Sequence, residues 1–196
     1  MRKEKIDELN SYIDLLKIKK IEFLDCFSKF LSTEKYVIEL NNGEVITREK
    51  LLKNGRDGNA SIVLPITVNN IVLLVVQPRV FTNCGIGVEL PAGYVDADEL
   101  YEVTARRELF EETGYVPEKV TLLGEFYQDQ GCSGAYNKCF LAEGCKKVGE
   151  QKLDSSEFIK YFECNVDELF ELLEQGYICD LQSQFTIEKA KQYIRR

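Results

Sequence analysis

The spacing of hydrophobic residues separates an N-terminal segment from a longer region of strands and helices. Between Ile6 and Phe30, apolar residues recur every three or four positions, and Lys20 interrupts the series. Such spacing is typical of an amphipathic helix. We therefore predict helix within residues 3–31, either as one helix broken near residues 19–20 or as a helix followed by a less regular stretch.

Residues 36–40 and 44–47 are rich in β-formers and flank the sequence Asn41-Asn42-Gly43. Asn-Gly supplies the positive φ angles that a tight hairpin turn needs. We therefore predict a β-hairpin between residues 36 and 50.

After Gly58 the pattern changes to β-branched runs at residues 60–68 and 71–76, which Asn69-Asn70 separates as a turn. Further strands are predicted at residues 88–90, 120–127, 138–142 and 158–164, and helices at residues 99–113, 166–175 and 184–193. This mixture predicts one mixed sheet with helices packed on it.

The helix at residues 99–113 has recognisable ends. Asp96 or Asp98 is expected to cap its start, Gly114 stands at its end, and Pro117 lies just beyond.

The apolar residues of this helix fall on two arcs. Leu100, Val103 and Phe110 share one arc and form the expected core face, whereas Leu109 points away from them. The pattern therefore indicates a helix that packs on two sides.

The same helix carries carboxylates at a spacing that indicates a metal site. Glu108 and Glu112 are four residues apart and therefore share one face. Two adjacent carboxylates repel each other, and Mg²⁺ relieves such repulsion because it prefers oxygen ligands and completes its shell with phosphates and water. The alternative from the residues alone is a solvated face of salt bridges.

Neighbouring residues support the metal interpretation. Arg107 can neutralise Glu111 and fix its orientation, since these residues are also four apart. Gly93 lets the preceding loop approach closely, so that the carbonyl of Ala92 could join the site.

The composition narrows the chemistry further. The chain contains no His, which excludes His-based zinc sites and Ser-His-Asp triads, so acid–base work falls to carboxylates, Lys, Tyr or Cys. The net charge of −8 disfavours nucleic acid as a partner. The N-terminus lacks the apolar core of a signal peptide, and the longest apolar run, residues 71–76, is too short to span a membrane. We therefore expect a cytoplasmic protein that binds no membrane.

A longer motif surrounds these glutamates, and it fills every fixed position of the Nudix box: Gly93-x5-Glu99-x7-Arg107-Glu108-Leu109-x-Glu111-Glu112-x-Gly114-Tyr115. From about Tyr36 to Tyr193 the chain resembles the Nudix hydrolase family, and specifically its ADP-ribose pyrophosphatase-like branch. The resemblance implies an α/β fold, an α/β/α sandwich around a mixed sheet, to which this chain would add an N-terminal helical segment and a β-hairpin.

The resemblance also implies a set of functional residues. The metal ligands would be the carbonyl of Ala92 and the carboxylates of Glu108, Glu111, Glu112 and Glu157. Two or three Mg²⁺, with Mn²⁺ as an alternative, would bridge the diphosphate and lower the pKa of the attacking water.

Catalytic roles would fall to Arg107, Glu111 and Glu157, with Asp154 as the second candidate for the base. Arg79 matches an arginine of the branch that contacts substrate phosphate.

The chain departs from the branch in the turn at residues 129–135. Gln130 replaces a proline there, and Ala135 stands near the place of a glutamate. We therefore weigh three functions: hydrolysis of ADP-ribose or a related nucleotide sugar, hydrolysis of another diphosphate such as a dinucleotide cofactor or a nucleoside triphosphate, and ligand sensing without catalysis.

Members of the branch are usually homodimers that exchange N-terminal strands. By that likeness, residues 1–57 would form a dimerisation element and residues 58–196 the hydrolase domain. Arg48 in the hairpin matches an arginine that reaches across the dimer to the substrate.

Overall fold

The computed structural model describes residues 3–16, 30–41 and 43–194. Helix α1 spans Lys3–Leu16 and buries Leu9 completely, which confirms the first part of the predicted N-terminal helix. The remainder of that prediction, including the break near residues 19–20, lies outside the described residues. Within the described ranges, no helix is both long and apolar enough to cross a lipid bilayer.

The main sheet is mixed, as the sequence predicts. Its strand order is β10-β4-β3-β9-β7, with β5 beside β4, β6 beside β3 and β8 beside β9. Strands β3 and β9 run parallel, whereas the other pairs are antiparallel. The strands are β3 (Ala60–Thr67), β4 (Ile71–Pro78), β5 (Ile86–Glu89), β6 (Ala92–Tyr94), β7 (Tyr115–Val116), β8 (Lys119–Tyr127), β9 (Tyr136–Lys147) and β10 (Lys160–Asn165).

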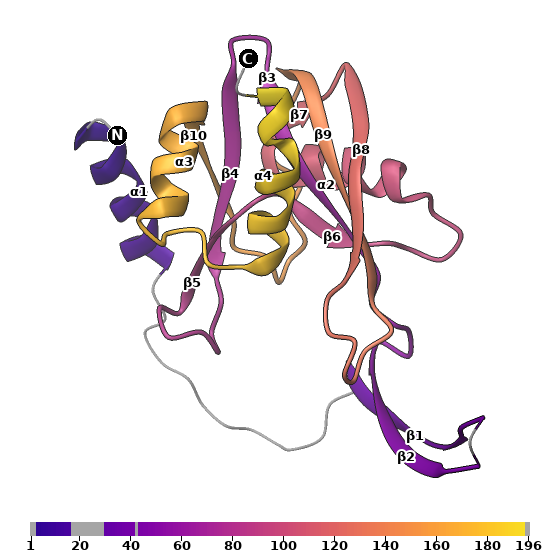
Figure 1. The fold of residues 1–196 in the computed structure, drawn as a ribbon. Helices are drawn as coiled ribbons and strands as arrows, with labels where there is room; N and C mark the ends of the chain where they lie inside the picture. The colour runs from indigo at the N-terminus through magenta and orange to yellow at the C-terminus, as the bar shows by residue number, and fades with distance from the viewer. Residues whose placement is uncertain (1–2, 17–29, 42, 195–196) are drawn as a thin grey trace.

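Helices cover both faces of this sheet, because alternate side chains of a strand point to opposite sides. Ile62 and Leu64 of β3 belong to the core beneath α1, α3 (Val166–Glu174) and α4 (Leu181–Ile194). Val63 belongs to a second core with Leu109 of α2 (Tyr101–Thr113). The resulting α/β/α sandwich, seen in Figure 1, confirms the predicted fold class.

The two ends of α2 differ in how well the sequence predicts them. Gly114 ends the helix in the left-handed conformation, with φ of 79°, as expected. The predicted cap at the start is wrong: Leu100 occupies the N-cap position, and no side chain caps the helix there. Asp98 turns the chain with φ of 63°, and the N–H of Asp96 donates to the Glu99 carboxylate.

The predicted core face of α2 is also wrong. Leu100 and Val103 are 72% and 49% exposed, whereas Ala105 and Leu109 are completely buried. The helix packs closely on the sheet, and the small side chain of Ala105 permits that approach. The ring of Phe110 instead lies beneath the ammonium group of Lys152, at 5.1 Å. Of the four apolar residues that the sequence placed on two arcs of this helix, only Leu109 is fully buried.

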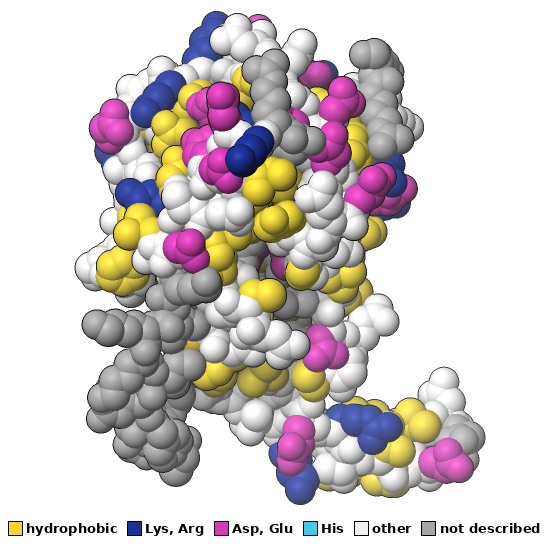
Figure 2. Space-filling model, turned by 90° about the vertical axis from the view of Figure 1, so that its left-hand side faces the viewer, with side chains coloured by type: hydrophobic (Ala, Val, Ile, Leu, Met, Phe, Trp, Pro, Cys, Tyr) yellow, Lys and Arg dark blue, Asp and Glu magenta, His cyan; other side chains and the backbone are white. Residues whose placement is uncertain are grey.

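The predicted hairpin is present as a separate two-stranded sheet of β1 (Leu31–Glu39) and β2 (Val45–Lys53). Figure 2 shows it as an arm at the lower edge of the molecule, with hydrophobic and charged side chains on its surface. Val37 and Val45 are 75% and 63% exposed. The arm is attached at its base, where the N–H of Leu51 donates to the carbonyl of Cys132 at 2.7 Å.

Candidate active site

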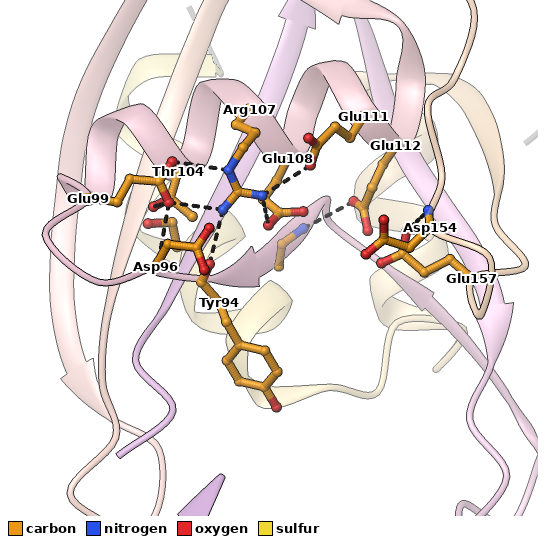
Figure 3. A network of polar contacts seen from close by, with 12 residues as sticks. Tyr94, Asp96, Glu99, Thr104, Arg107, Glu108, Glu111, Glu112, Asp154 and Glu157 are labelled. Carbon is orange, nitrogen blue, oxygen red and sulfur yellow. Dashed lines mark hydrogen bonds and ion pairs between the residues drawn. The ribbon is translucent and has the colours of Figure 1, made fainter. Parts of the chain in front are cut away.

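Two buried glutamates form the centre of the site. Glu108 and Glu112 are only 8% and 3% exposed, and both project from α2 toward the segment that joins β5 to β6 (Figure 3). The N–H of Ala92 donates to Oε2 of Glu112 at 3.2 Å. A Cβ on Gly93 would stand 1.9 Å from Oε1 of Glu108, so only glycine leaves room for this carboxylate.

Burial and mutual repulsion make both carboxylates costly to ionise. Removal from water raises the pKa of Glu108 to about 7, although the guanidinium of Arg107 opposes the rise. Burial raises the pKa of Glu112 well above its ordinary value, and the nearby charges of Glu108 and Glu157 add to the effect. The structure therefore concentrates carboxylate oxygens where they are poorly solvated.

Arg107 organises the acidic side chains around it. Its guanidinium donates two hydrogen bonds to Glu99, at 3.0 and 2.9 Å, one to Glu108 at 2.6 Å and one to Glu111 at 3.0 Å. It also donates to the carbonyl of Tyr94 at 3.1 Å. The hydrogen bonds from Arg107 lower the pKa of Glu99 to about 2. The predicted pairing with Glu111 is confirmed, and Glu99 proves to be the main partner of this arginine.

The loop before β10 brings a third acidic group to the site. The amide of Gln151 donates to the carbonyls of Glu112, at 2.5 Å, and Ile159, at 3.3 Å, and so fastens the loop to α2. In Figure 3, Asp154 and Glu157 both extend toward Glu112. The N–H of Asp154 donates to Oε2 of Glu157 at 2.9 Å, which keeps these two carboxylates side by side.

Arg79, the predicted phosphate contact, lies at the end of β4 and is held by a carboxylate. Its Nε and Nη2 donate to the buried Glu89 at 2.6 and 2.5 Å. The hydrogen bonds that Arg79 donates to Glu89 raise the pKa of Arg79, and the charges of Glu112 and Asp180 contribute further. Arg79 is therefore close to the acidic centre, with its orientation fixed by Glu89.

Arg48 is not brought to these residues within one chain. It lies on β2 opposite Tyr36 of β1, and its Nη1 donates to the carbonyl of the adjacent Thr47 at 2.9 Å. The turn at residues 129–135 contacts the base of the same hairpin through Ser133, which pairs with Leu51.

The side chains fit a divalent cation in their chemistry. Glu108 and Glu112 offer buried oxygen ligands of the kind that Mg²⁺ prefers, and a cation would stabilise the ionised forms that burial and the neighbouring carboxylates disfavour. Among the described residues, no three acidic or cysteine side chains already converge as a metal cage. Arg107 holds Glu108 and Glu111 in its own hydrogen bonds.

Sequence reasoning missed two residues that shape the site. Gln151 fastens the acidic loop to α2, and Glu89 orients Arg79. Gln151 belongs to no motif and leaves no signal in the sequence. The only sequence hint for Glu89 was its position, because it directly precedes Leu90-Pro91-Ala92, the residues that lead into the motif at Gly93.

Comparison with known proteins agrees with this geometry. The NUDIX domain model matches residues 57–181, which is more than half of the chain. The chain therefore belongs to the Nudix hydrolase family. Members of this family typically use a divalent metal, and the glutamate-bearing helix described above is the part of the fold that would bind it.

Individual relatives match different lengths of the chain. An ADP-ribose pyrophosphatase from Bacillus subtilis is 34% identical over 152 residues, which cover 77% of this chain and 80% of that protein. A GDP-mannose pyrophosphatase from Salmonella paratyphi B is 38% identical over 113 residues, covering 55% and 58%. The crystal structure of an ADP compounds hydrolase superposes with a TM-score of 0.74 at 19% identity, covering 87% of this chain and 90% of that one.

Proposed function

We propose that this protein hydrolyses, with Mg²⁺, the diphosphate bond of a nucleoside diphosphate linked to another moiety. The observation that carries the proposal is the pair of buried carboxylates, Glu108 and Glu112, beside the Ala92 backbone and the acidic loop. A site that only displayed a salt-bridge network would have no physical reason to bury two like charges together.

The metal ligands in this proposal are the carbonyl of Ala92 and the carboxylates of Glu108, Glu111, Glu112 and Glu157. When bound, Mg²⁺ supplies positive charge against the diphosphate and acidifies the attacking water. Mn²⁺, a similar hard cation, would serve as an alternative.

The residues of the chain then have distinct tasks. Arg107 orients Glu108 and Glu111 through the hydrogen bonds described above, and its bonds to Glu99 keep it in place. Glu157 receives the proton of the attacking water, and Asp154, which lies beside it, is the second candidate for this role.

Arg79 binds a phosphate oxygen in this proposal. Glu89 engages Nε and Nη2 of Arg79, so Nη1 is not used by that pair. Because the guanidinium is fixed before substrate arrives, little rotamer entropy is lost on binding.

ADP-ribose or a related nucleotide sugar is the first substrate class. The similarity to an ADP-ribose pyrophosphatase over 80% of that protein supports it. The second class is another diphosphate, such as a dinucleotide cofactor or a nucleoside triphosphate, which the altered turn at residues 129–135 favours.

The test is a substrate panel with product identification. Purified protein with Mg²⁺ is incubated with ADP-ribose, GDP-mannose, a dinucleotide cofactor and a nucleoside triphosphate, and products are separated by chromatography. Release of a nucleoside monophosphate from a nucleotide sugar, abolished by EDTA, is the expected result. If none of these compounds is turned over, the proposal is overturned and the third function, ligand sensing without catalysis, is favoured.

We further propose that residues 1–57 are a dimerisation element and residues 58–196 the hydrolase domain. The exposed Val37 and Val45 of the hairpin arm support this, because a second copy of the chain could bury them. In such a homodimer Arg48 would reach the substrate bound to the partner. Light scattering gives the molar mass, and a value of one chain would contradict the homodimer.

A further inference from the structure

The segment between β5 and β6 passes through the centre of the site, and α4 holds it from the opposite face of the sheet. The N–H of Leu90 donates to Oγ of Ser183 at 2.8 Å. Both residues are 1% exposed, so water cannot replace either partner. Ala92 follows Leu90 by two residues, and this hydrogen bond therefore anchors the backbone that carries the Ala92 carbonyl.

Ser183 is itself fixed by the first turn of α4. Its N–H donates to Oδ2 of Asp180 at 2.7 Å, and the N–H of Gln184 donates to the carbonyl of Asp180 at 3.1 Å. Asp180 therefore acts as the helix cap that sets the position of the Ser183 hydroxyl.

The rest of the segment is held from the α2 face and from within the sheet. Pro91 has no N–H, and its carbonyl accepts from the N–H of Val63 at 3.0 Å. The N–H of Ala92 donates to Glu112, itself one of the buried carboxylates. Ser183 thus supplies an anchor that depends on neither the sheet ladder nor the carboxylates of α2.

We propose that Ser183 is a positioning residue that sets the place of the Ala92 carbonyl and thereby the divalent-metal affinity of the site. The inference rests on the proposed function in one respect, because it takes Ala92 as a metal ligand. Loss of the Ser183 hydroxyl would leave the Leu90 N–H buried without its partner and free the segment to shift.

The test compares Ser183→Ala with a matched variant of the full chain. Thr186→Val removes another completely buried hydroxyl from the same helix, one that donates to the carbonyl of Gln182 instead of accepting from the segment. Ser183→Thr keeps the hydroxyl and should restore the wild-type behaviour.

Two measurements distinguish a role of Ser183 in positioning the Ala92 carbonyl from a role in the stability of the fold alone. Mn²⁺ affinity is measured without substrate by electron paramagnetic resonance, and the Mg²⁺ concentration for half-maximal turnover is measured with the best substrate of the panel. In Ser183→Ala we expect the Mn²⁺ dissociation constant and the half-maximal Mg²⁺ concentration both to rise about tenfold, as for other residues that orient metal ligands, with kcat at saturating Mg²⁺ within about threefold of wild type. Thr186→Val should leave both values unchanged.

Wild-type Mn²⁺ affinity in Ser183→Ala would overturn the inference, and so would an equal loss in Thr186→Val. The Mn²⁺ titration needs no substrate, so it is independent of the substrate panel. A wild-type protein that binds Mn²⁺ but hydrolyses nothing overturns the proposed function, while the comparison of Ser183→Ala with Thr186→Val still decides the role of Ser183.

Discussion

Helix α2 and the hairpin arm carry two groups of predicted functional residues under opposite physical conditions. On α2, Glu108 and Glu112 are buried, and Arg107 binds three carboxylates and a backbone carbonyl. On the arm, Arg48 is exposed and its side chain donates to the carbonyl of the adjacent Thr47, while Val37 is 75% exposed. One chain therefore fixes the geometry of the α2 residues, whereas the position of Arg48 relative to a substrate depends on what covers the arm.

The largest expected effect follows from removing a charge at the buried centre. Glu112→Gln should lower kcat by about 10³-fold or more, because a ligand for the cation is lost. Turnover is measured with the best substrate of the panel, and circular dichroism checks the fold. Glu102→Gln is the control, since Glu102 lies on the same helix, pairs with Arg106 and is exposed. Equal kcat values for the two variants would show that Glu112 does not take part in the reaction.

The acidic loop offers the next largest effect and decides which residue acts as the base. Glu157→Gln should lower kcat by about 10²-fold, within the usual contribution of general acid–base catalysis, and Asp154→Asn should have a smaller effect. The reverse order would assign the base to Asp154. If neither variant changes kcat, the loop contributes no group to the reaction.

A smaller effect is expected from the arm, and it tests the other side of the comparison. Arg48→Ala should raise KM by about tenfold and leave kcat nearly unchanged, because it removes one contact with an anionic substrate. Val37→Glu should convert a dimer to monomers in light scattering and reproduce the rise in KM. A monomeric variant with wild-type KM would show that each chain holds a complete site.

The last prediction concerns the stability of the metal-free protein, not its turnover. Because the folded protein raises the pKa of Glu108 from 4.5 to about 7, the free energy of unfolding falls as the pH rises through that interval. The loss is on the order of 3 kcal/mol when complete. In EDTA, Glu108→Gln should therefore melt about 7 °C above wild type at pH 8.

Two further conditions of the same melting experiment serve as controls. At pH 5 the melting temperatures of Glu108→Gln and wild type should be nearly equal. At pH 8, Mg²⁺ should reduce the difference in melting temperature, because it stabilises the wild type. A difference independent of pH would show that the ionisation of Glu108 does not cause it.

The sequence predicts the fold well where periodicity is strong. The runs that form β3 and β4 were predicted nearly to their ends, and so was the left-handed end of α2 at Gly114. Strands β6 and β7 were missed, because elements of three and two residues leave no periodic signal. The start of α2 was mispredicted, because the helix begins after Leu100 with no side-chain cap instead of at Asp96 or Asp98.

The site shows a similar division. Spacing along one helix correctly pairs Arg107 with Glu111, because i and i+4 contacts are local. The partners of Arg79 and Leu90 come from distant elements, namely β5 and α4, and no spacing rule connects them. The core face of α2 was misjudged for the same reason, since tertiary packing selected Ala105 over the larger Val103.

Gly93 shows that this site also depends on space that is kept free. A single added methyl group there would overlap the Glu108 carboxylate and push it aside without removing any charge or hydrogen-bonding group. Any side chain at position 93 would thus displace the Glu108 carboxylate, although glycine itself performs no chemistry. The position of the Glu108 carboxylate on α2 therefore depends on the Cβ atom that Gly93 of the neighbouring strand lacks.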